Sequence, residues 1–218
     1  MEKFAIAIDG PSGSGKSTTA KNIAKELGIE YVDTGAMYRA AALQAKLSST
    51  PLEEEAVDKM LSDVEIDFSD GKIFLNGRDV EDQIRNLEIS SLASQISKLK
   101  SCRSRLVDIQ RRIAASKSIV MDGRDIGSNV LPDARFKFYI TASVDIRAER
   151  RYRELVEKGQ NISLEEVKAD LLKRDHEDTT RKLNPLIKAE GAVEISTDEY
   201  SMEEMTQLIK SYVMKENK

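Results

Sequence analysis

The stretch Gly10-Pro-Ser-Gly-Ser-Gly-Lys-Ser17 decides the fold class of this 218-residue chain. It matches the pattern Gly-x-x-x-x-Gly-Lys-Ser/Thr and lies between an apolar run, Phe4–Ile8, and a helical pattern that starts at Lys16. Glycines let backbone N–H groups surround phosphate oxygens, and the helix N-terminus adds partial positive charge. Lys16 is expected to bridge the β- and γ-phosphates of ATP, and Ser17 to ligate Mg²⁺. The predicted ATP-binding residues are Gly10, Pro11, Ser12, Gly13, Ser14, Gly15, Lys16, Ser17 and Thr18.

Apolar strands alternate with amphipathic helices along most of the chain. The predicted strands are 4–8, 29–33, 118–121, 136–140 and 192–195. The predicted helices are 16–27, 36–47, 88–99, 102–115 and 143–158, with another after Ser201. This alternation predicts an α/β fold: a P-loop doubly wound parallel sheet with helices on both faces. Asp9, Asp33 and Asp122 each end a predicted strand, so we expect ligands to bind at that edge of the sheet.

A small antiparallel sheet is predicted within this pattern. The chain carries three short apolar or alternating segments at 64–68, 73–75 and 78–80. Asp70-Gly71 and Asn76-Gly77 separate them, and such pairs are typical of hairpin turns. We therefore expect a single P-loop domain, 1–218, that contains an inserted subdomain at about 36–100.

Capping boxes predict where two further helices begin. Thr50-Pro-Leu-Glu53, with proline at the first helical position, predicts a helix that runs to about Leu61. Ser163-Leu-Glu-Glu166 predicts a helix that ends at about Arg174. A short helical lid over ATP is expected at about 147–165, with Gly159 as a hinge.

The composition narrows the class of protein. The net charge of −4, from 34 basic and 38 acidic residues, argues against a broad nucleic-acid-binding surface, and no apolar run approaches a membrane span. The one cysteine, Cys102, excludes an intrachain disulfide, fits a cytoplasmic location and is expected to pack in a helix. The one histidine, His176, argues against a histidine-based metal site, and we expect it near the surface. We expect a monomer whose partners are small-molecule substrates, with no nucleic acid and no membrane.

A P-loop alone leaves three classes of protein open. A GTPase switch usually has an Asn-Lys-x-Asp sequence that recognises guanine, and this chain has none. An ATP-driven motor has a hydrophobic Walker B strand, and 118–122 could serve as one, so this alternative stays open. A kinase is favoured because arginines, which neutralise charge during phosphoryl transfer, are frequent in the second half of the chain. One cluster consists of Arg147, Arg150, Arg151 and Arg153, about half of which could equally be ordinary helix-surface residues.

Four sequence blocks together resemble the bacterial cytidylate kinase family over almost the whole chain. They are Gly10–Thr18, Asp33-Thr-Gly-Ala-Met-Tyr-Arg39, Asp122-Gly-Arg-Asp-Ile-Gly127 and Arg174-Asp-His-Glu-Asp-Thr-Thr-Arg181. The resemblance implies a nucleoside monophosphate kinase with a core, a lid and an enlarged CMP-binding insertion. It implies that ATP phosphorylates CMP and dCMP with Mg²⁺. The implied catalytic residues are Lys16, Arg150, Arg153 and Arg181.

The resemblance also implies which residues contact the phosphate and the sugar of CMP. It places the phosphate near Arg39, Arg124 and Arg181, whose planar guanidinium groups match phosphate oxygens. It places the ribose near Arg174 and Asp178, and a carboxylate can accept hydrogen bonds from sugar hydroxyls.

Cytosine recognition is implied for Ser94, Arg103 and Asp125. A carboxylate accepts from the cytosine amino group and arginine donates to N3 and O2, whereas uracil would leave buried polar groups unpaired. Two alternatives stay open: Asp125 could pair with the neighbouring arginine, and Ser94 and Arg103 could be ordinary helix-surface residues. Asp33 and Thr34 complete the expected CMP-binding set. Thr34 stands where we expect serine in many relatives, and it keeps the hydroxyl.

Overall fold

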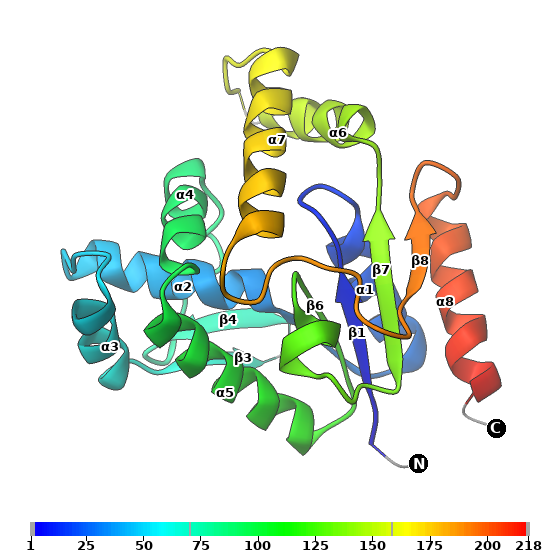
Figure 1. Cartoon of the computed structure of the whole chain (residues 1–218), viewed down its shortest axis with the longest axis horizontal. Helices are drawn as coiled ribbons and strands as arrows, with labels where there is room; N and C mark the ends of the chain where they lie inside the picture. Colours follow the sequence, from blue (N-terminus) through cyan, green and yellow to red (C-terminus); the bar gives the residue numbers. More distant parts are fainter. Residues whose placement is uncertain (1–2, 70, 158, 217–218) are drawn as a thin grey trace. The chain divides into compact units, whose positions relative to one another are not determined.

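The computed structural model describes residues 3–69, 71–157 and 159–216 (Figure 1). Its helices are α1 (Lys16–Leu27), α2 (Thr34–Leu47), α3 (Glu54–Ser62), α4 (Leu87–Ile96), α5 (Lys100–Ser116), α6 (Val144–Glu157), α7 (Leu164–Thr180) and α8 (Met202–Glu216), and Ile126–Val130 forms a short π-helix, η1. Its strands are β1 (Ala5–Asp9), β2 (Glu30–Asp33), β3 (Ile66–Ser69), β4 (Lys72–Leu75), β5 (Arg78–Asp79), β6 (Ile119–Gly123), β7 (Phe136–Thr141) and β8 (Val193–Ser196). Within these residues no helix is long and apolar enough to cross a membrane.

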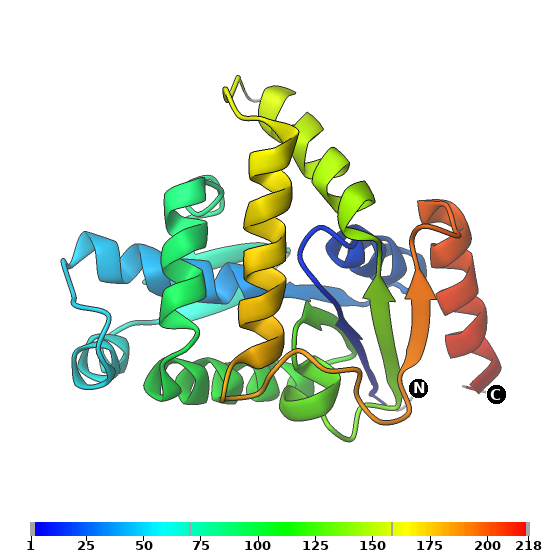
Figure 2. The ribbon, with the colours of Figure 1, turned by 45° about the horizontal axis from the view of Figure 1, so that its top comes forward.

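The described residues contain one five-stranded parallel sheet in the order β2-β6-β1-β7-β8. β7 pairs in parallel with β1 on one side and with β8 on the other. Ile6, Ile8, Phe138 and Ile140 on these strands are buried. α1 and α8 lie side by side in both views (Figures 1 and 2). The predicted α/β class with a helix-flanked parallel sheet is confirmed, and each predicted strand agrees to within two residues.

The chain divides into two compact units, which are described separately below. The core unit comprises Phe4–Ile29 and the residues from Val120 onward, and the insertion unit comprises Glu30–Ile119. The predicted insertion, 36–100, lies inside the second unit, and its role in binding CMP stays a prediction.

The insertion unit contains the predicted small antiparallel sheet, in the order β3-β4-β5. α2 packs against α4 and against β3 and β4. Phe68 of β3 and Tyr31 pack edge to face, with their ring centroids 6.3 Å apart. Asn76 and Gly77 have φ angles of 50° and 73°, as a two-residue hairpin turn between β4 and β5 requires. Asp70, in the other predicted turn, lies outside the described residues.

The predicted start of α3 is wrong. The helix begins at Glu54 rather than at Pro51. The hydroxyl of Thr50, the expected cap, lies 2.7 Å from the hydroxyl of Ser48 and belongs to the preceding turn. Glu54, the first residue of α3, accepts the first backbone N–H groups of α5 at 2.8 and 2.9 Å, so its carboxylate caps α5.

α6 and α7 form a helical hairpin with a small core of its own (Figure 2). The predicted capping box at Ser163 and Glu166 is present. The predicted end of this helix at Arg174 is wrong, because α7 continues to Thr180 and the N–H of Arg181 still donates to a carbonyl of the helix at 3.1 Å. Residues 174–181 therefore share one helix and its C-cap. Lys158, the predicted last residue of the preceding helix, lies outside the described residues.

Cys102 and His176 lie where the sequence analysis expected them. Cys102 is fully buried in α5, and burial raises the pKa of its thiol to about 12. His176 is exposed on α7.

Candidate active site

The P-loop joins β1 to α1 in the core unit and leaves the N-terminus of α1 open. Gly10 has a φ of 156°, and a Cβ atom there would lie 2.0 Å from the carbonyl oxygen of Ile140. Gly15, the N-cap of α1, is left-handed, and no described side chain caps the helix there. The first N–H groups of α1 can therefore donate to phosphate oxygens. The hydroxyl of Ser14 is buried and has no hydrogen-bond partner among the described residues, which suits a donor reserved for a ligand.

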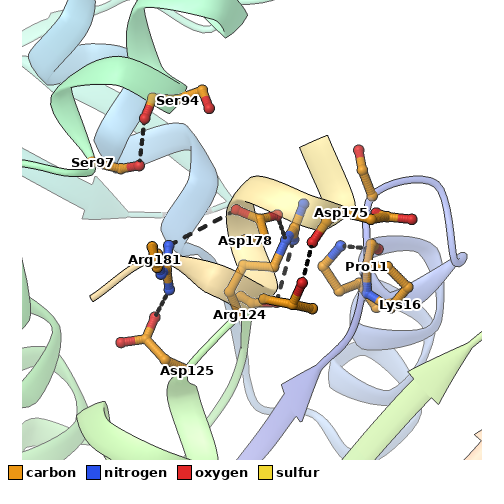
Figure 3. A network of polar contacts seen from close by, with 12 residues as sticks. Pro11, Lys16, Ser94, Ser97, Arg124, Asp125, Asp175, Asp178 and Arg181 are labelled. Atoms are coloured by element: carbon orange, nitrogen blue, oxygen red, sulfur yellow. Dashed lines mark hydrogen bonds and ion pairs between the residues drawn. The ribbon is translucent and has the colours of Figure 1, made fainter. Parts of the chain in front are cut away.

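Lys16 is buried beneath this loop. Its Nζ donates to the carbonyl of Pro11 at 3.0 Å (Figure 3). Burial, and next the positive charge of Arg124, lower the pKa of Lys16 to about 7, and Asp122 opposes the shift. A cation that the folded protein disfavours is stabilised when a ligand brings negative charge to it.

Ser17 and Asp122 form an oxygen-rich pair at the end of β6. The Ser17 hydroxyl donates to Oδ2 of Asp122 at 2.7 Å, and Asp122 is buried. A hydroxyl and a carboxylate are hard oxygen ligands, and protein-bound Mg²⁺ commonly combines one or two such groups with substrate phosphates. The two side chains thus fit a magnesium site that nucleotide phosphates would complete.

Two arginine–carboxylate pairs link the end of β6 to α7 and its C-cap (Figure 3). Nε of Arg124 donates to Oδ2 of Asp178 at 2.7 Å. Nη2 of Arg181 donates to Oδ1 of Asp125 at 3.2 Å, and its Nη1 lies 3.9 Å from Oδ1 of Asp178. Burial alone would raise the pKa of Asp178, but the surrounding arginines, Arg124 first, hold it below its usual range. The core unit therefore brings together four of the predicted CMP-binding residues.

Two further arginines of the core unit, Arg174 and Arg147, act on residues of the P-loop and of α7. Arg174 is half-buried on α7, and its charge acts on both Lys16 and Asp178. Arg147, on α6, is buried and donates to the carbonyl of Ser12 at 3.0 Å and to Oδ2 of Asp175 at 2.6 Å. Arg147 thus links the P-loop to α7. Of the four arginines at 147–153, it is therefore not an ordinary helix-surface residue.

The two predicted catalytic arginines of α6 lie in different surroundings. Arg150 donates to the hydroxyl of Thr197 at 2.8 Å, and a Cβ atom on Gly15 would lie 3.9 Å from its Nη1. Arg153 pairs with Glu149 at 3.3 Å, and its side chain is 72% exposed. Arg150 therefore lies beside the P-loop, whereas Arg153 lies on the solvent side of the helix.

Asp33 organises the predicted phosphate contact of the insertion unit. Its Oδ1 accepts the N–H of Ala36 at 2.8 Å, and its Oδ2 accepts from Arg39 at 2.9 Å and from Arg85 at 3.1 Å. Burial would raise the pKa of Asp33, but the two arginines outweigh it and lower the pKa. Nε of Arg39 is buried without a hydrogen-bond partner among the described residues, so it can serve a ligand. Thr34 follows as the buried first residue of α2.

Ser94 and Arg103 also belong to the insertion unit. Arg103 is 4% exposed, lies over the Tyr38 ring at 5.6 Å from its centroid, and donates to the carbonyl of Ser97 at 3.3 Å. The alternative that Arg103 is an ordinary surface residue is therefore wrong. Ser94 is half-buried, and its carbonyl accepts the hydroxyl of Ser97 at 2.8 Å (Figure 3).

Three residues of the site, Arg85, Asp175 and Asp122, are not among the predicted site residues. Arg85 lies in no motif, and only the fold brings it to Asp33. Asp175 lies in the sequence block 174–181, three residues before Asp178, and residues with this spacing share one face of a helix, which is the sequence signal that indicates it. Asp122 was recognised as a strand end, but not as the partner of Ser17.

A P-loop with a buried lysine, a serine–carboxylate pair and adjacent arginine side chains defines an ATP-dependent phosphotransferase of the P-loop kinase class. The family model for cytidylate kinase matches residues 6–215. The cytidylate kinase of Thermotoga neapolitana is 49% identical over 94% of this chain and 94% of its own length. That of Clostridioides difficile is 42% identical over 98% of this chain and 99% of its own length.

The chain belongs to the cytidylate kinase family. The predicted family, and with it the predicted enzyme class of nucleoside monophosphate kinases, is confirmed. Among solved structures, an uncharacterized protein from Eubacterium ventriosum superposes with a TM-score of 0.52 at 16% identity, covering 97% of this chain and 98% of its own. At that identity the likeness concerns the fold alone.

Proposed function

We propose that this chain transfers the γ-phosphoryl group of ATP to CMP and dCMP, with Mg²⁺, through its P-loop and its arginine–carboxylate pairs. The observation that carries the proposal is the Ser17–Asp122 pair at 2.7 Å, which belongs to the same unit as Lys16 and the Arg124–Asp178 pair. Membership of the cytidylate kinase family supports the reaction and its two substrates.

Residues Gly10–Thr18 bind the phosphates of ATP in this proposal. Lys16 neutralises charge on the β- and γ-phosphates, whose approach favours its protonated form. Ser17 and Asp122 hold Mg²⁺, which shields the phosphate charge when it is bound with the nucleotide.

Arginines whose direction a carboxylate already fixes bind the phosphate of CMP. Arg124 is held by Asp178 and Arg181 by Asp125, so each guanidinium group keeps one direction in which it would meet phosphate oxygens. Arg39 contributes its free Nε from the insertion unit. The proposed CMP-binding set is Asp33, Thr34, Arg39, Ser94, Arg103, Arg124, Asp125, Arg174, Asp178 and Arg181.

Lys16, Arg150, Arg153 and Arg181 stabilise the transferring phosphoryl group. Arg150 already lies beside Gly15, so it needs a smaller rearrangement than Arg153, which must first leave Glu149. The lid at 147–165 and the CMP-binding insertion at 36–100 are parts of the same proposal.

A coupled assay of ADP release tests the proposed substrates and the residue that reads the base. We expect turnover with CMP and dCMP to exceed turnover with UMP, AMP and GMP. Asp125→Asn should lower the preference for CMP over UMP by about tenfold or more, because an amide can either donate or accept.

The matched control is Asp133→Asn, because Asp133 is an exposed aspartate beyond η1. It should leave the preference unchanged. If Asp125→Asn also leaves the preference unchanged, the base is read by other residues. If no nucleoside monophosphate is phosphorylated, the proposed function is wrong.

A further inference from the structure

Asp9 makes a pair of contacts that the proposed function does not use. It is the last residue of β1, directly before the first glycine of the P-loop, and it is 3% exposed. Its Oδ1 accepts the backbone N–H of Ile126 at 2.8 Å, and its Oδ2 accepts that of Gly127 at 2.8 Å. One carboxylate thus holds two consecutive backbone groups that are more than a hundred residues away in sequence.

The two N–H groups open η1, directly after the turn that carries Arg124 and Asp125. The first N–H groups of a helix have no partner within the helix itself, so Asp9 supplies an acceptor from another element. The carbonyl of Asp125 meanwhile accepts the N–H groups of Asn129 and Val130 at 2.9 and 3.0 Å. The backbone of Asp125 is therefore held from both sides, and this sets the direction in which its side chain meets Arg181.

We propose that Asp9 is a positioning residue for the monophosphate substrate: by holding the N–H groups of Ile126 and Gly127, it fixes the turn whose Arg124 and Asp125 contact CMP. The same residue leads directly into the P-loop, so Asp9 ties the turn that contacts the acceptor nucleotide to the loop that holds the donor phosphates. The inference rests on the proposed role of Arg124 and Asp125.

Because the pKa of Asp9 is shifted, its role can be tested by the pH dependence of KM for CMP, which a purely structural residue would not affect. Burial raises its pKa to about 6, the two backbone N–H groups oppose this, and among nearby charges Asp125 raises the pKa and Arg124 lowers it. From β7, Tyr139 lies opposite Asp9 in the sheet, and the stem of Lys137 lies beside Gly127. A proton on one oxygen below pH of about 6 would remove an acceptor from the turn.

Asp9→Asn removes one of the two acceptors at every pH, because the amide keeps one acceptor oxygen and presents an N–H donor to the second backbone N–H. We expect KM for CMP to rise by about tenfold or more and the preference for CMP over UMP to fall, with KM for ATP changed by less than about twofold. The ratio of KM for CMP, variant over wild type, should approach one as the pH falls from about 8 to about 5. The titration of the CMP phosphate cancels in this ratio.

Two further variants keep the test decisive. Ile209→Val removes a buried methylene group from α8 and should lower stability while leaving both KM values unchanged. Gly127→Ala retains the Asp9 carboxylate but brings a Cβ atom to 3.4 Å from its Oδ2 and 3.2 Å from Ala189, so it should raise KM for CMP even if Asp9→Asn does not fold.

The outcomes separate this inference from the proposed function. A KM ratio that is constant with pH, or an equal rise in KM for ATP and CMP, overturns the role of Asp9. If Asp125→Asn changes the base preference and neither Asp9→Asn nor Gly127→Ala affects CMP, the proposed function stands and this inference fails. If Asp125→Asn has no effect either, the proposed role of the turn fails with it.

Discussion

Replacing Lys16 by methionine tests the electrostatics of the P-loop. The pKa of Lys16 falls from 10.5 to about 7, because burial and then Arg124 disfavour its charged form. At about 1.4 kcal/mol for each tenfold change in proton affinity, the charged form is destabilised in the folded protein by on the order of 5 kcal/mol. Methionine keeps the apolar stem and carries no charge, so the substitution should stabilise the fold while it removes the phosphate-binding cation.

The pH dependence of this gain has a definite sign. Between pH 7 and 10.5 the unfolded chain binds a proton on Lys16 that the folded chain does not, so the wild-type protein gains stability as the pH rises through this range. The methionine variant lacks this dependence. The gain in the free energy of unfolding should therefore be complete at pH 6.5 and below, and should fall by about 2 to 3 kcal/mol by pH 9.

Urea unfolding at these two pH values measures the gain, and a coupled assay measures turnover. Lys210→Met is the matched control, because Lys210 lies at the surface, 2.6 Å from Glu26, and its loss should change stability by less than about 0.5 kcal/mol. We expect Lys16→Met to lower kcat by about a thousandfold or more. An equal gain at both pH values would refute the electrostatic reasoning, and near-normal turnover would refute the proposed role of Lys16.

Three other predictions follow from single contacts. Ser17→Ala should raise the Mg²⁺ concentration that gives half-maximal activity by about tenfold, whereas Ser17→Thr, which keeps the hydroxyl, should not; equal curves in a Mg²⁺ titration would exclude Ser17 as a ligand. Arg85→Met removes one of the cations that lower the pKa of Asp33, so stability from this carboxylate should be lost at a higher pH as acid is added, and an unchanged acid-unfolding midpoint would contradict this. Cys102, whose pKa burial raises to about 12, should react with a thiol reagent at neutral pH only when urea opens the core; a fast reaction in the folded protein would contradict its burial.

Local signals were sufficient to predict the P-loop and the elements around it. α1 has the predicted bounds, Lys16–Leu27, and ends at Gly28 in a left-handed conformation. Both features were predictable because the apolar helical face and the glycine cap lie within one short stretch of sequence. The hairpin at Asn76-Gly77 is local in the same sense. Where a local signal had a competing use, the prediction failed. The hydroxyl of Thr50, the expected cap, contacts Ser48 of the preceding turn, and the helix predicted to begin at Pro51 begins at Glu54.

The pairing within the site was less predictable, because it depends on contacts between distant segments. The resemblance named Arg124 and Asp178, but their contact spans 54 residues and follows only from the extension of α7 beyond Arg174. With the helix ending at Arg174, as the sequence analysis expected, Asp178 would not have been placed on a helix at all. Arg147 shows the same limit, since it is one of four arginines in a charged helix and only the fold buries it against Ser12.

These pairs suggest how the protein keeps anion-binding arginines ordered without a bound substrate. An arginine loses side-chain entropy when it is held in one orientation, and a substrate that had to impose that order would bind more weakly. Here Asp178 holds Arg124, Asp125 holds Arg181 and Asp33 holds Arg39, so this ordering is already present in the fold. The carboxylates do not cancel the function of the arginines, because a guanidinium group has five N–H donors and a contact with one carboxylate engages one or two of them. An arginine with a carboxylate partner is therefore better suited to position a phosphate than a freely rotating one, since the geometry of transfer tolerates little misplacement.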